Sequence, residues 1–379
     1  MTDAERQIRN KTAIVGVGYT PVLRHAQRSL GAIAMDAALD AIADAGLKRE
    51  DIDGYVGTPS GPAAAGGNPD GVGQISAPYL AGALGIQGLR FSVDIVGLPS
   101  TALEIAIHAL YGGLCRYVLL LRAMYSAPDG QRSTGSGTRA AGPAQFTLPY
   151  GLSGGGPQFA LGLQRYMHEH GATREELFAI VDAARTHAQL NPVAYWHGKT
   201  LTLEDYLNAR FIYQPLCLLD CDLPVTTAGA LIVTTAERAR DLPHRPAYVS
   251  GFAGTAPGKE TVFELSGVER KDVDAAQIYD GYSPFVWYWL EQLGFCATGE
   301  AHAWCQDGRI KLGGELPVNT AGGNLGEGHF QGFGHLREGT MQIMGRCGDR
   351  QVPGAKNCLV AAGQPTSSRS RHAIMLSAL

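Results

Sequence analysis

The stretch RFSVDIVGLPSTALEIAIHALYGGLCRYVLLLR, residues 90–122, decides the fold class. Residues 90–96 and 116–122 are short apolar runs of strand length, and residues 100–112 between them form an apolar segment of helix length, rich in Ala, Ile and Leu. Apolar strands that alternate with a helix are typical of a parallel sheet covered on both faces. The stretch therefore predicts an α/β protein.

The same alternation continues on both sides of this stretch. Further strands are expected at 11–17, 52–57, 230–234, 245–254 and 358–362, helices at 30–45, 157–170, 175–190 and 286–293, and loops at 60–73 and 127–156. The order of elements starts again near residue 245. We therefore predict two similar halves, 1–243 and 244–379, with an insertion of loop and helices at about 125–215 in the first.

Composition excludes several functional classes. The 379 residues are 45% hydrophobic, carry a net charge of -4 and contain no basic block, which argues against nucleic-acid binding. No apolar run reaches the ~18 residues of a membrane helix, and no secretory signal is evident, so a cytoplasmic protein is expected. The seven cysteines show no paired spacing beyond Cys217 and Cys221, which predicts reduced thiols and no metal site.

The segment VGLPSTA, residues 96–102, is the first that could carry chemistry, because it joins a strand to a helix. A nucleophile at a helix N-terminus has a lowered pKa. No cysteine is present here, and Ser100 is the candidate hydroxyl nucleophile. The alternative, which we favour from the residues alone, is that Ser100 only caps the helix.

The segment IYDGYSPF, residues 278–285, is the second candidate. If Ile278 ends a strand, Tyr279 and Asp280 point to opposite faces, and one of them can point into a pocket. The alternative is that Tyr279 and Tyr282 are packing aromatics with a hydrogen-bonded hydroxyl, and the residues alone favour it.

The third candidate is NTAGGNLGEGHFQGFGHLRE, residues 319–338, which we expect to be a glycine-rich loop with open backbone amides. It contains His329 and His335. Glycine on either side makes a packed structural histidine less expected, so His329 is the best candidate for acid–base or oxyanion chemistry. The flanking pattern does not match a dinucleotide-binding loop.

Taken together, four segments resemble the thiolase superfamily in its lipid-transfer (sterol-carrier) branch. They are the junction at 96–102, RYMHEHGATREELFAIVDAARTHAQLNPVAY (165–195), YDGYSPFVWYWLEQLGFC (279–296) and VNTAGGNLGEGH (318–329). The resemblance covers nearly the whole chain. It implies a thiolase fold of two pseudo-repeated βαβαβαββ halves in a five-layer αβαβα arrangement, with a homodimer core.

The departures from the thiolase pattern bear on function. The resemblance places Leu98 where thiolases have their nucleophilic cysteine, and an aliphatic side chain cannot form a thioester. Tyr279 stands where thiolases have an Asn or His that polarises the thioester, whereas His329 is retained. A second thiolase cysteine falls at Cys358 or at Leu359, and the sequence leaves that register open.

This pattern is similar to the bacterial steroid side-chain-cleaving aldolases. The similarity implies retro-aldol cleavage of a β-hydroxy acyl-CoA, of the 17-hydroxy steroid 20-carboxyl-CoA type, into a 17-keto steroid and propionyl-CoA or a shorter acyl-CoA. It also implies a separate OB-fold and zinc-ribbon partner in a heterotetramer. CoA is then part of the substrate, zinc is expected only in the partner, and this chain needs no cofactor.

We hypothesise that His329 is the base and Tyr279 the hydrogen-bond donor to the enolate. An unperturbed histidine titrates near neutrality, whereas a tyrosine base would need a neighbouring positive charge. Asp280, Tyr282 and His335 are secondary candidates. Two rival functions remain: an acyltransferase or thiolase whose nucleophile has moved to Ser100 or Cys358, and a non-catalytic subunit that binds acyl-CoA or lipid.

Overall fold

The computed structural model describes residues 8–58, 72–126, 142–152, 156–254, 261–365 and 372–379. Nine strands in these residues form one mixed sheet in the order β3-β2-β4-β7-β1-β8-β11-β10-β9, and β5 and β6 form a separate pair. The loop predicted at 60–73, apart from its last two residues, and most of the loop predicted at 127–156 lie outside the described residues.

The first half follows the predicted βαβαβαββ order. Its elements are β1 (Thr12–Tyr19), α2 (Leu30–Asp44), β2 (Gly54–Gly57), α3 (Ala77–Leu84), β3 (Phe91–Asp94), α4 (Pro99–Tyr111), β4 (Tyr117–Met124) and β7 (Thr227–Thr235). Between β4 and β7 lie α5 (Gly156–His170), α6 (Arg174–Gln189), α7 (Leu203–Leu207), β5 (Phe211–Tyr213) and β6 (Leu216–Cys217). This interval includes the residues, about 125–215, for which an insertion of loop and helices is predicted, and the insertion stays a prediction.

Two glycines of β1 explain how α2 packs on the first half. A Cβ on Gly16 would lie 2.4 Å from the carbonyl oxygen of Ala41, and one on Gly18 would lie 2.2 Å from that of Ala37. Only glycine therefore permits this close approach of helix to strand. The buried face of α2 is correspondingly rich in alanine.

Across the sheet, the strands of the second half are arranged in an order that mirrors that of the first half. Its elements are β8 (Ala247–Gly254), α9 (Val262–Ser266), β9 (Ala275–Ile278), α10 (Pro284–Leu293), α11 (Ala301–Trp304), α12 (Gly323–Gly326), α13 (Phe333–Met344), β10 (Asn357–Ala362) and β11 (His372–Ser377). The two halves join where β1 pairs antiparallel with β8. Residue 243 lies between α8 (Ala236–Ala239) and β8, and the domain boundary there stays a prediction.

The third strand of the second half is reduced to one bridge between Ala276 and Val318. Pro317 has no N–H to lengthen this ladder. The side chain of Asn319 replaces the missing backbone hydrogen bonds. Its Oδ1 accepts from the Ile278 N–H at 2.7 Å, and its Nδ2 donates to the Ile278 carbonyl at 2.8 Å. Asn319 thereby fixes the backbone immediately before Tyr279.

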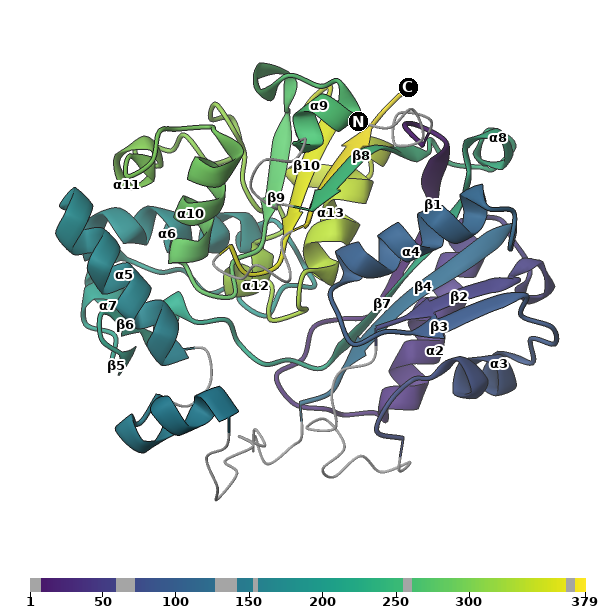
Figure 1. Cartoon of the computed structure of the whole chain (residues 1–379), viewed down its shortest axis with the longest axis horizontal. Coiled ribbons are helices and arrows are strands. Elements are labelled where there is room, and N and C mark those ends of the chain that lie inside the picture. Colours follow the sequence, from purple (N-terminus) through teal and green to yellow (C-terminus); the bar gives the residue numbers. More distant parts are fainter. Residues whose placement is uncertain (1–7, 59–71, 127–141, 153–155, 255–260, 366–371) are drawn as a thin grey trace.

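The elements stack in five layers, as predicted. Helices α4 and α13 lie between the two halves of the sheet, and α2 and α3 cover the outer face of the first half (Figure 1). Helix α9 packs on the outer face of the second half, and α5, α6 and α10 share the apolar cluster on that side. Three clusters of buried apolar side chains fill the space between these layers. None of the helices in the described residues combines the length and apolarity that crossing a bilayer requires.

Most predicted strands and helices are present with ends shifted by a few residues, but the prediction that 319–338 is a loop throughout is wrong. Helix α12 lies inside it, and α13 begins at Phe333, so His335 is on a helix. Glycine disfavours the helical conformation, and for that reason the glycine-rich sequence of this segment predicted a loop. Here Gly339 allows α13 to approach the sheet, because a Cβ on it would lie 2.7 Å from Cγ2 of Val360.

Candidate active site

The candidate site lies where the carboxyl end of β9 meets the N-termini of α4 and α13. A Cβ on Gly332, the residue that precedes α13, would lie 3.7 Å from Cδ2 of Tyr279 and 3.9 Å from Cδ of Pro99, the first residue of α4. Helix N-termini carry partial positive charge and unpaired backbone N–H groups. This arrangement suits a reaction that develops negative charge beside Tyr279.

Tyr279 directly follows β9, and its backbone N–H donates to the Ala361 carbonyl of β10 at 2.8 Å. Its side chain is buried, and its ring stacks near Phe285 with 6.3 Å between ring centroids. Burial raises the pKa of Tyr279, and the charges of Asp222 and Asp280 raise it further. The phenol is therefore protonated at neutral pH and can act as a hydrogen-bond donor.

His329 forms a pair with Asp222, a residue that the sequence did not single out. The imidazole Nδ1 contacts the Asp222 carboxylate, and the two side chains are 19% and 12% exposed. A carboxylate can only accept, so Nδ1 carries the proton and a neutral His329 keeps the Nε2 lone pair. Within the part of the chain that the structure describes, the His329 ring makes its hydrogen bond through Nδ1 and none through Nε2.

Asp222 also connects His329 to Tyr279. Its backbone N–H donates to the Gly281 carbonyl at 3.2 Å. A Cβ on Gly281 would lie 3.0 Å from the Tyr279 hydroxyl, so Gly281 borders that hydroxyl directly. The structure thus brings the two predicted catalytic residues to one centre, with Asp222 between them.

Asp280 and His335 form a second pair, which is buried and connects α12 and α13 to the end of β9. The Asp280 carboxylate accepts from the Asn324 N–H at 2.7 Å, from the Leu325 N–H at 3.3 Å and from His335 Nε2 at 2.9 Å. Both side chains are at most 1% exposed. The pair ties α12 and α13 to the end of β9, which is a structural role.

Tyr282 belongs to an aromatic cluster beside the site. Its ring centroid lies 4.9 Å from that of Phe159 and 5.5 Å from that of Phe285. Its backbone pairs with Cys221, the residue before Asp222. Packing is therefore its evident contribution.

Leu98 immediately precedes α4, at the position that the resemblance assigns to the thiolase nucleophile. The interpretation of Ser100 as the helix cap is wrong, because the helix already begins at Pro99 and Leu98 is the capping residue. Pro99 suits the first helical position because its φ is preset and it needs no N–H there. The Ser100 hydroxyl is buried and has no hydrogen-bond partner in the described residues.

Among the described residues, no thiol takes the place of Leu98. Cys358 is fully buried at the start of β10, where it faces Gly339 of α13, and burial raises the pKa of its thiol. It lies three residues, roughly 10 Å of strand, before Ala361, the residue that holds Tyr279. Cys221 directs its Sγ to the Cys217 carbonyl at 3.5 Å.

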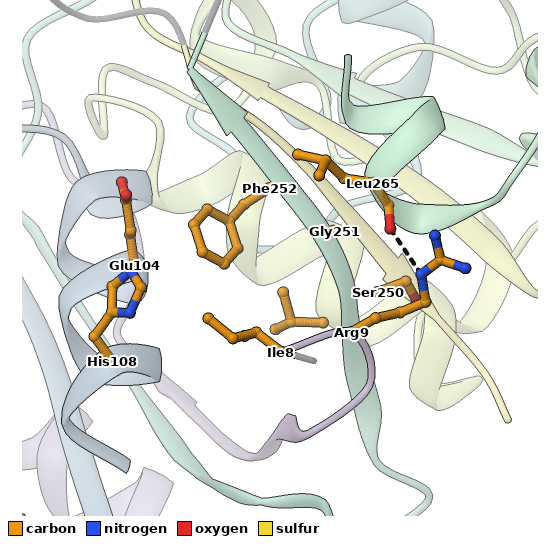
Figure 2. Close-up of a pocket in the computed structure, with 9 residues that line it drawn as sticks. Ile8, Arg9, Glu104, His108, Ser250, Gly251, Phe252 and Leu265 are labelled. Atoms are coloured by element: carbon orange, nitrogen blue, oxygen red, sulfur yellow. Dashed lines mark hydrogen bonds between the residues drawn. The ribbon is translucent and has the colours of Figure 1, made fainter. Parts of the chain in front are cut away.

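A separate hollow of about 140 Å³ lies beside the C-terminal half of α4 (Figure 2). Its lining includes Glu104, His108, Phe252, Ile8, Arg9 and Leu265. Arg9 is held there by a hydrogen bond from its Nε to the Leu265 carbonyl at 2.7 Å. The hollow contains none of the predicted site residues. In the described ranges, no group of three or more His, Cys, Asp or Glu side chains is arranged to hold a metal ion.

Comparison with known proteins identifies the family. Residues 240–377 match the family model "Thiolase C-terminal domain-like". The chain is 36% identical, over 94% of its length and 98% of the relative, to the 17-hydroxy-3-oxo-4-pregnene-20-carboxyl-CoA lyase of Mycobacterium tuberculosis. It is 34% identical, over 94% of its length and 96% of the relative, to the steroid side-chain-cleaving aldolase of Thermomonospora curvata.

A solved structure agrees with these relatives. The structure of the "Ltp2-ChsH2(DUF35) aldolase" superposes with a TM-score of 0.83 and 33% sequence identity, and the match covers 98% of both chains. Together with the sheet order and the five layers, these similarities show that the chain belongs to the thiolase superfamily and, within it, to the family of the steroid side-chain-cleaving aldolases.

Proposed function

We propose that this chain is a carbon–carbon lyase that cleaves a β-hydroxy acyl-CoA by a retro-aldol reaction. The substrate would be a 17-hydroxy steroid with a 20-carboxyl-CoA side chain, and the products a 17-keto steroid and propionyl-CoA or a shorter acyl-CoA. The names of the two sequence relatives support this substrate class. The observation that carries the proposal is that an aliphatic residue, Leu98, precedes α4 at the site where Gly332 borders both Pro99 and Tyr279, while His329 is paired with Asp222.

The reaction balances without a covalent enzyme intermediate. His329 Nε2 removes the proton of the β-hydroxyl, the oxygen lone pair forms the ketone, and the bond between the α and β carbons breaks. The electron pair of that bond becomes the enolate of the departing acyl-CoA. His329 then returns its proton to the α carbon, which yields the acyl-CoA and restores the enzyme.

The division of roles follows from the environment of each side chain. Tyr279 is protonated, because burial and two nearby carboxylates raise its pKa, so it donates to the enolate oxygen instead of accepting a proton. Asp222 fixes the His329 ring with Nε2 directed away from the carboxylate, and it stabilises the imidazolium that forms. The N-termini of α4 and α13 add to the stabilisation of the enolate.

The assembly that we propose is a homodimer core with a zinc-ribbon and OB-fold partner, together a heterotetramer. Strand β3 supports the dimer, because it is an edge strand that pairs with β2 alone within the described sheet, and Val96 beyond it is 95% exposed. The related solved structure supports the partner, because its name, Ltp2-ChsH2(DUF35) aldolase, joins two proteins. In this proposal zinc belongs to the partner, and this chain uses no cofactor of its own.

The deciding experiment is a cleavage assay with a 17-hydroxy steroid 20-carboxyl-CoA, with the partner present and absent, that follows the 17-ketone and the acyl-CoA. We expect the two products in equal amounts. Intact-mass measurement after incubation with substrate should show no acyl adduct on the chain. The matched variant Leu98→Cys tests whether a thiol at this place is acylated by acyl-CoA, which a nucleophile position would allow.

Two outcomes would contradict the proposal. A stable acyl adduct on Ser100 or Cys358 of the unmodified chain would favour the acyltransferase alternative. Tight binding of the substrate with no ketone release, even with the partner present, would favour a non-catalytic acyl-CoA-binding subunit.

A further inference from the structure

We propose that Arg122 of β4 is the fixed cation of this site, and that it acts through Tyr279 by strengthening the tyrosine hydroxyl as a donor to the enolate oxygen. The inference rests on the retro-aldol function proposed above. It concerns a residue that the sequence presents only as the end of an apolar strand.

The register of β4 directs Arg122 toward the central layer. Side chains alternate along a strand, and Val118 and Leu120 belong to the central cluster whereas Leu119 and Leu121 belong to the outer one. Arg122, two residues after Leu120, therefore faces the layer that contains α4 and α13.

Arg122 and Tyr279 approach the N-terminus of α13 from the two halves of the sheet. Arg122 is paired with Gly229 of β7. A Cβ on Gly229 would lie 2.4 Å from Cε1 of Phe333, the first residue of α13, and the preceding Gly332 borders Tyr279. The Arg122 Nη1 also donates to the Thr58 carbonyl at 3.0 Å, next to the end of β2.

The hydrogen bonds of Arg122 do not explain its burial. It is 2% exposed, its Nε has no partner, and no carboxylate pairs with it among the described residues. Two other deeply buried arginines have carboxylate partners: Arg337 pairs with Glu327 at 2.6 Å and Arg350 pairs with Glu338 at 3.2 Å. Arg185 also has an unpaired Nε, but its guanidinium lies 3.4 Å from the centroid of the Trp196 ring. A buried cation without an anion costs stability, so it is retained where a negative charge arises.

The electrostatics of the two side chains agree with this placement. Burial lowers the pKa of Arg122 to about 10, and the phenol of Tyr279 acts against that change. In turn, Arg122 is the positive charge that opposes the rise in the pKa of Tyr279 caused by burial, Asp222 and Asp280. A phenol with a lower pKa donates a stronger hydrogen bond to an enolate.

The test compares Arg122→Met with Arg122→Lys in the full chain with its partner. Two CoA thioethers serve as probes, one with a nitronate in place of the enolate and one with a neutral carboxamide. We expect Arg122→Met to weaken nitronate binding and to slow cleavage by about 100-fold, with carboxamide binding unchanged, and Arg122→Lys to restore part of both losses. Because Arg122→Met removes an uncompensated buried charge, its melting temperature should not fall.

A Tyr279→Phe background shows whether Arg122 acts through the tyrosine. There, Arg122→Met should cause almost no further loss of nitronate affinity. Equal weakening of the two probes, or unchanged nitronate affinity, would overturn the inference, and Arg122→Gln provides the same comparison where the Met variant does not fold. If the wild-type protein prefers the nitronate probe but cleaves no substrate, the proposed function is contradicted and the role of Arg122 is not. If Arg122→Met cleaves substrate at the normal rate, only the role of Arg122 is contradicted.

Discussion

The molecule contains two histidine–aspartate pairs that look alike in composition and differ in surroundings. His329 and Asp222 lie 107 residues apart in the sequence, and their side chains are 19% and 12% exposed. His335 and Asp280 lie 55 residues apart, and their side chains are at most 1% exposed. Asp280 also accepts two backbone N–H groups, and the Nδ1 of His335 is buried without a hydrogen-bond partner among the described residues.

The difference teaches which pair can move a proton. A histidine needs an unoccupied ring nitrogen that substrate can reach in order to act as a base. Of these two histidines, His329 is partly exposed and His335 is buried. The pair of His335 is sealed in the interior and holds α12 and α13 against β9. Substitutions in the two pairs should therefore differ in their effects on the cleavage rate and on stability.

The largest expected effect is that of His329→Ala. It removes the proposed base and should lower the cleavage rate by about 100–10,000-fold, the range typical of a lost acid–base group. The side chain is partly exposed, so the melting temperature should change little. Steady-state cleavage and thermal unfolding, measured on the same preparation, check this, and a variant that cleaves at the normal rate would break the comparison.

His335→Ala should show the opposite balance. It leaves the Asp280 carboxylate buried without its histidine, so we expect the free energy of unfolding to fall by roughly 3–5 kcal/mol. Denaturant titration measures this loss, and the cleavage rate per folded molecule should exceed that of His329→Ala. If His335→Ala keeps the stability of the wild type but cleaves as slowly as His329→Ala, the catalytic and structural roles have been assigned to the wrong histidines.

Asp222→Asn tests the proposed catalytic pair of His329 and Asp222 from the aspartate side. The amide can donate to His329 Nδ1, which would move the ring proton to Nε2 and remove the base. We expect a rate lower by about 100-fold with unchanged substrate binding. Asp222→Glu, which keeps the carboxylate, is the matched control and should retain more activity than Asp222→Asn.

The sequence predicted the layers better than the site. Continuous apolar strands such as 116–122 and the alanine-rich helix at 30–45 specify burial by themselves, so the strand–helix order was recoverable. Helix α13 was not, because Gly334 and Gly339 lower helix propensity. Only the contact of Gly339 with β9 and β10 shows why glycine is needed at that position.

Tyr279 and His329 could be selected as candidates from the sequence because they stand at positions that the family pattern marks. Asp222 was not, since it follows Cys221 in a segment without regular periodicity, and only the fold brings it to His329. Arg122 was hidden in the same way, at the end of a strand whose facing layer the sequence does not reveal. Long-range pairing of charges is a property of topology, which local patterns do not encode.

His187 is a buried histidine without a carboxylate partner among the described residues, and its substitution should give the smallest effect. Its Nδ1 contacts the Asn319 carbonyl at 3.1 Å, and its Nε2 accepts from the Leu312 N–H at 3.0 Å. Burial lowers its pKa to about 4, below the usual value of about 6.5 in an unfolded chain. Between these values the unfolded chain binds a proton that the folded chain does not.

Stability should therefore be complete above pH 6.5 and should fall as the pH drops toward 4, by at most about 1.4 kcal/mol per pH unit from this group. His187→Gln should flatten this part of the pH dependence in denaturant titrations at about pH 7, 6 and 5, whereas His197→Gln, at an exposed position, should leave it unchanged. Because His187 contacts Asn319, and Asn319 holds the backbone before Tyr279, the same protonation should loosen the site. If His187→Gln keeps the full wild-type slope, this histidine is not the acid-sensitive support of Tyr279.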